Sequence, residues 1–470
     1  LEPEDLVLRN KWLFANSPQI ETHKKDQKGL LRSFWIQRMV GPRVRALKMI
    51  YESDGFQGVE RLINEKEVSG DAVGRTLGVY SLRIQENTIE WILDQATAFS
   101  TGNPTSIALR GFFRELSFAH RFESVVDRII ANGMNRCWDP VVMARLLALL
   151  PHEERVWQKI ESLGKEVLAE YWKNFVPDFN DIHVHLPFVT EKLLKADRPY
   201  TALQVNHFND LKYSRIDQLL QGFLQLPNAA ETVPGTIIDS YLLEEVLVHL
   251  VKSGELEDDV LVPLQFSYFS VLANANPIAT AALMPRASTD PDFFVQLVTN
   301  TVAQGNHTPG AAEAKLQGDA ETSHRILLKL NRMAGAIWKG VSNQRALNSF
   351  VREALRLAAL NQCQNPAASI LGSILARVAG RDRNEQWPPM HIADLLESEN
   401  IDSLWSGFCG GILESEGAHF RDPMAGGNPE RSTEQYYRIL GREWSASHPK
   451  LGKHFLSVAD VYGSWAISED

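Results

Sequence analysis

The chain has 470 residues, of which 44% are hydrophobic, and its formal net charge is −10. A single hydrophobic core stops growing at about 250–300 residues, so we expect either several domains or one array of repeats. The apolar content excludes a disordered chain, and the acidic balance argues against nonspecific binding to nucleic acid. Apolar runs fall short of the ~20 residues of a membrane span, and three scattered cysteines without a CxxC pair favour a reducing compartment. These features predict a soluble cytoplasmic protein.

Apolar residues recur along the chain with the spacing of an amphipathic helix. Leu243, Val246, Leu247 and Leu250, for example, form one stripe on a helix of about 3.6 residues per turn. No stretch of six or more residues alternates strictly between apolar and polar, so no substantial sheet is expected. In chain order, we predict helices at 4–14, 22–53 with a kink at Gly41-Pro42, 56–66, 84–99, 104–132, 139–150, 152–174, 187–196, 199–208, 213–226, 239–253, 257–273, 290–303, 320–339, 343–362, 366–379, 388–415, 430–447 and 449–467.

Asn-Pro and Asp-Pro pairs open four of the apolar-periodic segments, at 103–104, 139–140, 290–291 and 365–366. Asn or Asp at the N-cap accepts a hydrogen bond from a free backbone amide, and Pro at the next position has no amide to satisfy. The intervals between these prolines, 36, 151 and 75 residues, lie near multiples of about 37 residues, within the range of helical-repeat periods. We therefore predict an all-α fold whose stacked helix pairs form an elongated body, similar to an α-solenoid of TPR or HEAT repeats.

Three segments interrupt the helical pattern. Residues 175–187 contain Val-Pro-Asp and Asn-Asp pairs, and they predict a boundary between an N-terminal helical subdomain, 1–178, and a C-terminal helical-repeat subdomain, 179–470. Residues 304–319 and 418–429 are rich in Gly and Pro and predict long loops. Because loops carry function more often than helices do, both loops are candidates for contact with a partner.

The sequence lacks the motifs of nucleotide and acyl chemistry, since neither a GxxxxGK phosphate loop, a GxGxxG turn nor a GxSxG nucleophile turn occurs. The pair His183 and His185 is the strongest metal-like feature. Asp178, Asp181 and His207 could supply further ligands, but none of them follows at a diagnostic spacing. The alternative is a connecting loop with solvent-exposed imidazoles, and we predict that no metal ion is bound there.

The loop 416–431 concentrates polar groups between two strong helical segments. As an active site it would use His419 as a base, with Glu416 or Asp422 as the partner of that base. As structure, it would simply make a tight turn and cap the next helix. Cys409 precedes the loop within an apolar helical stretch, which favours a buried, inert thiol. We therefore predict no catalytic residues, no cofactor and no enzyme activity.

Charge is unevenly distributed in the second half of the chain. Residues 231–292 hold ten acidic and two basic side chains, whereas residues 322–383 hold ten basic and two acidic ones. Helical spacing places three cations on each of two successive helices, which predicts a basic ridge that contacts a protein partner, with 231–292 as its acidic counterpart. The alternatives are a solvated face neutralised by neighbouring repeats and a nucleic-acid surface, which the lack of interleaved aromatic residues disfavours. The basic ridge consists of Arg325, Lys329, Arg332, Arg345, Arg352 and Arg356, with Arg377, Arg381 and Arg383 at a helix end.

Five segments spread in order over nearly the whole chain carry a family resemblance: RNKWLF at 9–14, AEYWKN at 169–174, LLKADRPYTAL at 193–203, DPDFFV at 290–295, and FRDP through ER to YYR at 420–438. Together they resemble the C-terminal helical region of very large bacterial multidomain proteins of the conflict-system, or antiphage-defence, type. Those proteins are similar in layout to STAND-type immune NTPases, with an effector or NTPase module followed by long helical repeats. The resemblance implies a sensor or scaffold part with an effector upstream of Leu1, and it identifies no functional residue.

These observations predict a non-enzymatic recognition or scaffold domain of a larger cytoplasmic bacterial protein, as the sensor or partner-binding part of a defence system. Helical repeats build extended concave surfaces on which proteins bind. The expected partner is a protein, either the upstream effector module or a phage or host protein, and oligomerisation of the chain is a further alternative. The rival class is a metal-dependent hydrolase or nuclease, which would require polar groups around His183 and His185, or in the 416–431 loop, to converge in one pocket.

Overall fold

The computed structural model describes residues 3–15, 30–81, 85–95, 103–117, 122–177, 185–229, 239–272, 276–302, 311–339, 341–380, 387–415 and 426–469. Within these residues the regular structure is helical, and the β-type contact is one isolated antiparallel bridge between Ala15 and Val68. The prediction of an all-α fold is therefore confirmed. Among the residues that the structure describes, none of the helices combines the length and the apolar composition that crossing a bilayer requires.

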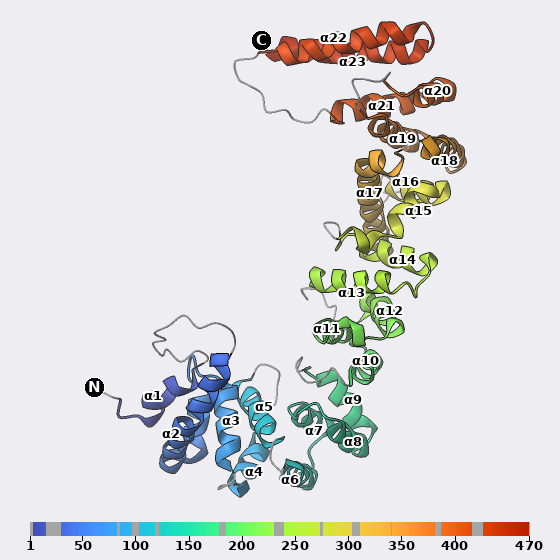
Figure 1. Ribbon diagram of the computed structural model, residues 1–470. Helices are drawn as coiled ribbons and strands as arrows, with labels where there is room; N and C mark the ends of the chain where they lie inside the picture. Colours follow the sequence, from blue (N-terminus) through green and yellow to red (C-terminus); the bar gives the residue numbers. More distant parts are fainter. Residues whose placement is uncertain are drawn as a thin grey trace. The chain divides into compact units, whose positions relative to one another are not determined.

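Figure 1 shows the helices in chain order. They fall into two compact units, Leu1–Ile238 and Asp239–Asp470, each with its own core of buried aliphatic and aromatic side chains. The first unit contains α1 (Leu6–Asn10), η1 (Lys11–Phe14), α2 (Leu30–Ile63), α3 (Gly70–Tyr80), α4 (Gln85–Asp94), α5 (Pro104–Ser117), α6 (Phe122–Asn135), α7 (Pro140–Leu147), α8 (Glu154–Ser162), α9 (Lys165–Asn174), α10 (Leu186–Lys195), α11 (Pro199–Phe208), η5 (Leu211–Tyr213), α12 (Ile216–Gln225) and η6 (Leu226–Asn228). The second unit contains α13 (Ser240–Ser253), α14 (Asp258–Tyr268), η8 (Pro277–Thr280), α15 (Leu283–Thr289), α16 (Pro291–Val302), α17 (Ala311–Ile337), α18 (Val341–Leu360), α19 (Gln364–Ala379), α20 (Met390–Glu399), α21 (Asp402–Ser415), α22 (Asn428–Ser445) and α23 (Pro449–Glu469).

The predicted boundary at 178–179 lies inside the first unit, because side chains on both sides of it share one core. Trp172 of α9 contacts Phe188 of α10, with ring centroids 6.0 Å apart. Arg198, at the start of α11, donates a hydrogen bond to the backbone oxygen of Trp172 over 3.1 Å. These contacts join the helices before and after the predicted boundary, and the structure divides into compact units at 238–239 instead.

Three of the four predicted Asx-Pro caps are confirmed. Asn103, Asp139 and Asp290 each accept a hydrogen bond from a backbone amide in the first turn of α5, α7 and α16 respectively. The fourth prediction is wrong, because α19 begins one residue before Asn365 and places this side chain inside the first turn. Asn365 instead accepts a hydrogen bond from the Ser403 hydroxyl of α21, 3.2 Å away. Its polar group therefore serves a contact between two helices.

Two further boundaries differ from the prediction. Residues 388–415 form two helices rather than one, because Asn400 adopts the left-handed conformation, with φ 50° and ψ 41°, that ends α20. Asn is one of the few residues other than Gly that reach this conformation at low cost. The loop predicted at 304–319 is too long, since α17 begins at Ala311. The predicted gap between the helices at 22–53 and 56–66 is confirmed by Gly55, whose positive φ of 61° interrupts α2, whereas Pro42 of the predicted kink lies inside the helix.

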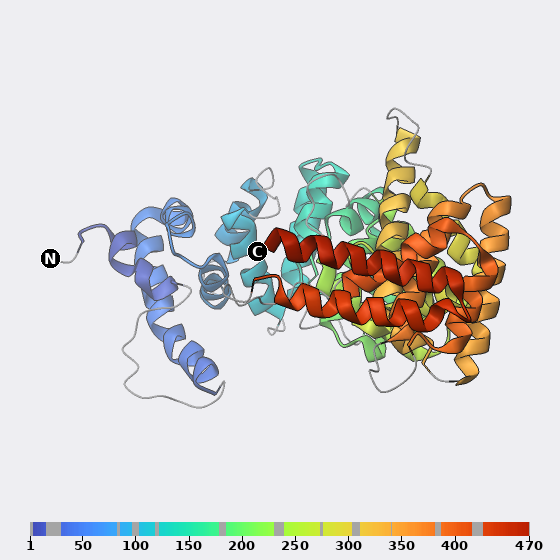
Figure 2. The same ribbon diagram turned by 90° about the horizontal axis from the view of Figure 1, so that it is seen from above.

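Several helix pairs approach closely because glycines lie at their crossings. A methyl group at Gly74 of α3 would lie 1.7 Å from the backbone oxygen of Ala108 on α5. A methyl group at Gly407 of α21 would lie 1.9 Å from the backbone oxygen of Ser369 on α19, and one at Gly427 would lie 2.2 Å from a backbone oxygen of α23. Helices α22 and α23 lie side by side along their length (Figure 2). Only a residue without a Cβ atom permits such contacts between backbones.

Candidate functional site

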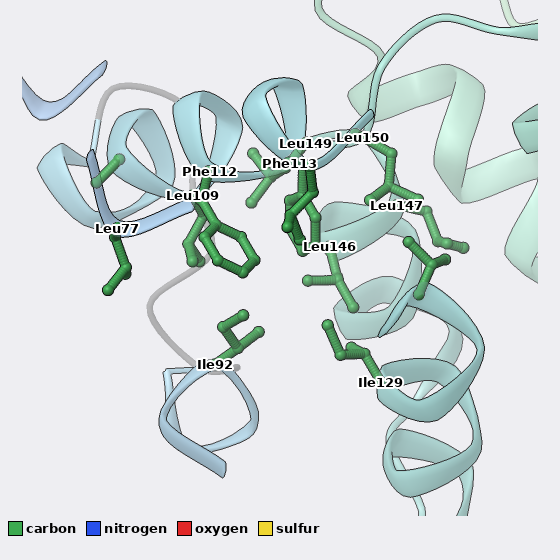
Figure 3. Close-up of a cluster of buried hydrophobic side chains, with 14 of the residues drawn as sticks. Leu77, Ile92, Leu109, Phe112, Phe113, Ile129, Leu146, Leu147, Leu149 and Leu150 are labelled. Carbon is green, nitrogen blue, oxygen red and sulfur yellow. The ribbon is translucent and has the colours of Figure 1, made fainter. Parts of the chain in front are cut away.

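A pocket of about 180 Å³ lies among α6, α7 and α8 of the first unit. Its floor is apolar and its rim is charged, a composition that suits one apolar group held in place by a few polar contacts. The floor side chains belong to the core of the unit, part of which is drawn in Figure 3. The floor consists of Phe122, Val126, Leu147, Leu150 and Val156, and the rim of Glu123, Arg155 and Lys159.

The floor of the pocket is supported from behind by the core. Phe122 and Val126 lie one turn apart on α6, and both side chains are buried. Figure 3 shows Leu147 and Leu150 within a buried cluster that Ile129 of α6 also enters. Because protein cores are densely packed, side chains held in this way have little freedom to move into the pocket. The pocket is therefore present before a ligand binds.

Two acidic residues of α6 and two basic residues of α8 form matched ion pairs along the rim. Arg155 lies 3.3 Å from Glu123, and Lys159 pairs with Asp127 one turn further along both helices. The Arg155 guanidinium also lies over the Phe122 ring, 5.0 Å from its centroid, and so covers one side of the floor. The rim charges are neutralised within the chain. When an apolar group binds at the floor, each rim charge therefore keeps its ion-pair partner as water is displaced.

Sequence reasoning missed this pocket, although the sequence contains a signal for it. Glu123 and Asp127 are four residues apart, and so are Arg155 and Lys159. Equal spacing of opposite charges on two helices indicates that the two helical faces pair with each other. The signal becomes specific only when α6 and α8 are known to be neighbours, because charges four residues apart occur on many solvent-exposed helices.

The structure distributes the six residues of the basic ridge over α17 and α18, each of which packs against α16 and α19. The five arginines are exposed, whereas Lys329 is half-buried. The Lys329 ammonium lies over the Phe269 ring, 5.5 Å from its centroid, and donates a hydrogen bond to the Thr280 hydroxyl over 3.2 Å. Burial lowers the pKa of Lys329. This lysine is therefore engaged with its own chain.

Half of the basic ridge is paired with glutamates that lie outside the acidic segment 231–292. That segment makes ion pairs of its own, from Asp259 and Asp290 to Arg286. Arg332 and Arg345 are exposed and form no ion pair with a residue that the structure describes. The ridge thus offers fewer available cations than its sequence indicates, and its role in binding stays a prediction. The ion pairs are Arg325 with Glu321, Arg352 with Glu399, and Arg356 with Glu353.

Reversing three charges of the basic ridge, by Arg345→Glu, Arg352→Glu and Arg356→Glu together, is expected to leave the fold intact. Exposed ion pairs contribute little to stability, so the melting temperature measured by circular dichroism should change by less than about 3 °C. If the ridge contacts acidic surfaces, binding of labelled poly-L-glutamate should weaken at least about fivefold and lose its dependence on salt. Equal, salt-independent binding by both proteins would identify the ridge as a solvated face.

The described residues of the candidate metal site, His185 and His207, each pack against an aromatic ring. His185 packs edge-on against Trp157, with ring centroids 5.3 Å apart, and His207 lies on α11 beside Phe208. Within the part of the chain that the structure describes, no group of three or more His, Cys, Asp or Glu side chains is placed to hold a metal ion. The other candidate ligands, Asp178, Asp181 and His183, and the loop residues Glu416, His419 and Asp422, lie outside the described residues.

The three cysteines occupy different environments. Cys137 is exposed, Cys363 is buried and Cys409 is half-buried. Burial raises the pKa of the Cys409 thiol to about 12. Because the thiolate is the reactive form of cysteine, a thiol with this pKa is a poor nucleophile at neutral pH. The environment of Cys409 fits the inert thiol predicted from its apolar sequence neighbours.

Comparison with known proteins assigns no role to the candidate site. The resemblance to defence proteins rests on the five sequence segments alone. No protein-family model matches the chain, and neither a curated protein nor a solved structure shows significant similarity to it.

Proposed function

We propose that the chain is a non-enzymatic recognition domain that binds a protein partner, and that the pocket among α6, α7 and α8 receives an apolar side chain of that partner. The observation that carries the proposal is the combination of a preformed apolar floor with a rim of internally paired charges. Protein interfaces obtain most of their affinity from a few apolar or aromatic anchors that fill pockets, while a polar rim excludes water from them.

The pocket suits a side chain better than a polar substrate. Its floor offers aliphatic and aromatic surface, and the rim cations Arg155 and Lys159 already have carboxylate partners. A polar substrate would have to break these ion pairs and would find no replacement hydrogen bonds at the apolar floor. An apolar anchor would gain burial and leave the rim pairs intact.

Sequence features support a proposal for the architecture and the biological role of the chain. We propose that successive helix pairs of the chain stack as an elongated, α-solenoid-like body, which the spacing of the Asx-Pro pairs supports. We further propose that the chain is the sensor or partner-binding part of a bacterial defence protein, in the cytoplasm. The resemblance of the five sequence segments supports this assignment. The partner would then be the effector module of the same protein, or a phage or host protein.

Filling the pocket from within is expected to abolish partner binding without unfolding the chain. Val156→Phe places a larger apolar side chain at the floor, and Val126→Phe does so from the opposite helix. Peptides selected from a phage-displayed random library on the wild-type chain should carry an aromatic or aliphatic anchor, and they should bind each filled variant at least about tenfold more weakly. Affinities would be measured by fluorescence anisotropy, after circular dichroism has shown that the variants are folded.

The matched control is Val260→Phe, which adds the same side chain at a valine that is 40% exposed on α14 of the other unit. This variant should bind the selected peptides like the wild type. Two results would refute the proposal: a selection that enriches no peptide, or selected peptides that bind the folded Val156→Phe and Val126→Phe variants as tightly as the Val260→Phe variant.

A further inference from the structure

An arginine cluster, formed by Arg43, Arg75, Arg110 and Arg114, surrounds Asp71 where α2, α3 and α5 meet in the first unit. The Nε atom of Arg75, one turn after Asp71 on α3, lies 2.9 Å from the carboxylate. Arg114 approaches the same carboxylate from α5, at 3.7 Å. The two helices approach closely at this point: a methyl group added at the neighbouring Gly111 would lie only 2.6 Å from the Asp71 backbone oxygen.

Arg43 joins the cluster from α2 and is held in place by its own contacts. Its Nε atom donates a hydrogen bond to the backbone oxygen of Leu13 over 2.7 Å, and its guanidinium lies 5.9 Å from the centroid of the Phe14 ring. Burial lowers the pKa of Arg43, the nearby carboxylate of Asp71 raises it, and the like charge of Arg75 lowers it. This guanidinium is therefore a fixed, partly desolvated cation beside the carboxylate.

Arg110 is the member of the cluster without an acceptor. It lies one turn before Arg114 on α5, is half-buried, and forms no hydrogen bond or ion pair with any residue that the structure describes. Burial lowers the pKa of Arg110, and the like charge of Arg114 lowers it further. Nearby His152 adds no negative charge to balance these cations. The carboxylate of Asp71 thus lies near all four guanidinium groups of the cluster.

We propose that the arginine cluster binds a phosphate-type oxyanion, which bridges Arg110 and Arg114 while Arg43 and Arg75 add positive charge around it. Guanidinium groups bind phosphate oxygens through paired N–H hydrogen bonds. Two arginines one turn apart repel each other, and a half-buried guanidinium without a hydrogen-bond acceptor is unfavourable. A bound dianion would remove both costs. Asp71 holds Arg75 and Arg114 in place, so the site is assembled before the anion arrives.

The chemistry admits two sources for the anion, free inorganic phosphates or the phosphoryl groups of a nucleotide. Isothermal titration calorimetry with inorganic phosphate, pyrophosphate and ATP, each at the same ionic strength in chloride, distinguishes them. We expect saturable binding of pyrophosphate or ATP to the full chain at submillimolar concentration. Binding of both identifies the phosphate groups alone as the ligand, and binding of ATP alone identifies a nucleotide.

Variants of Arg110 test whether the arginine cluster is responsible for that binding. Arg110→Gln should weaken it at least about tenfold, and Arg110→Lys, which keeps the charge but loses the planar fork, should weaken it several-fold. Arg442→Gln removes the same charge from an exposed position on α22 and should change nothing. Absence of saturable binding for all three ligands, or equal affinity of the Arg442→Gln protein and either folded Arg110 variant, would overturn the proposal. Peptide binding at the pocket uses other residues and should be equal in all variants, so the two proposals can fail separately.

Discussion

Replacing Gly407 by alanine is expected to destabilise the second unit by about 3 kcal/mol, whereas the same replacement at Gly410 is expected to stabilise it by about 0.5–1 kcal/mol. Both residues lie on α21. A methyl group at Gly407 would lie 1.9 Å from the backbone oxygen of Ser369, while a methyl group at Gly410 meets nothing within 4 Å. The first change forces two helix backbones apart, and the second only restricts the unfolded chain and favours the helix.

The free energies of unfolding of Gly407→Ala, Gly410→Ala and the wild type would be measured by urea unfolding followed by circular dichroism. Gly74→Ala, which would place a methyl group 1.7 Å from the Ala108 oxygen, should have an effect as large as that of Gly407→Ala, but on the first unit. If the Gly407→Ala protein proved as stable as the Gly410→Ala protein, this result would contradict the close contact between the backbones of α19 and α21 at Gly407.

Acidification is expected to destabilise the first unit through His152. This side chain is 8% exposed and packs on the Phe175 ring, with centroids 4.4 Å apart. Burial, followed by the charges of Arg110 and Arg114, lowers the pKa of His152 from 6.5 to about 3. Between these values the unfolded chain binds a proton that the folded chain does not. The stability contributed by neutral His152 is therefore complete above about pH 6.5 and is lost as the pH falls, at about 1.4 kcal/mol per pH unit.

The matched variant for this effect is His152→Asn, which keeps a polar side chain but does not titrate. Free energies of unfolding would be measured in urea at pH 7, 6 and 5 for both proteins. The wild type should lose about 1–2 kcal/mol more than the variant across this range. Equal losses in the two proteins would show that His152 is accessible to protons in the folded chain.

Local features of the fold could be predicted because they depend on neighbours in sequence. The apolar stripe of Leu243, Val246, Leu247 and Leu250 is buried along α13, as helical periodicity predicts. Asp139 caps α7 because its side chain reaches an amide only three residues away. The end of α20 at Asn400 could have been anticipated, because Asn tolerates the left-handed conformation and residues 397–403 around it are polar except for Ile401.

The division of the chain into units and its candidate sites depend on tertiary contacts. Local sequence patterns do not indicate which distant segments make these contacts. Trp172 and Phe188 share a core across a segment that looks like a linker. Helical spacing did predict that Arg325 is exposed, and Glu321, one turn earlier, could have been recognised as its partner. The pocket and the arginine cluster are different, because each assembles residues from three or more segments that only the packing of helices brings together.

Methyl NMR of the full chain with a selected peptide tests the proposed recognition pocket most directly. Leucine and valine methyl groups would be labelled, and the library-derived peptide with the highest affinity would be titrated in. We predict that the largest shift changes belong to Val126, Leu147, Leu150 and Val156, which line the pocket, while those of Val351 and Leu371 in the core of the second unit stay unchanged. Saturable peptide binding that leaves the four pocket residues unshifted, or that shifts residues of the second unit instead, would contradict the proposal.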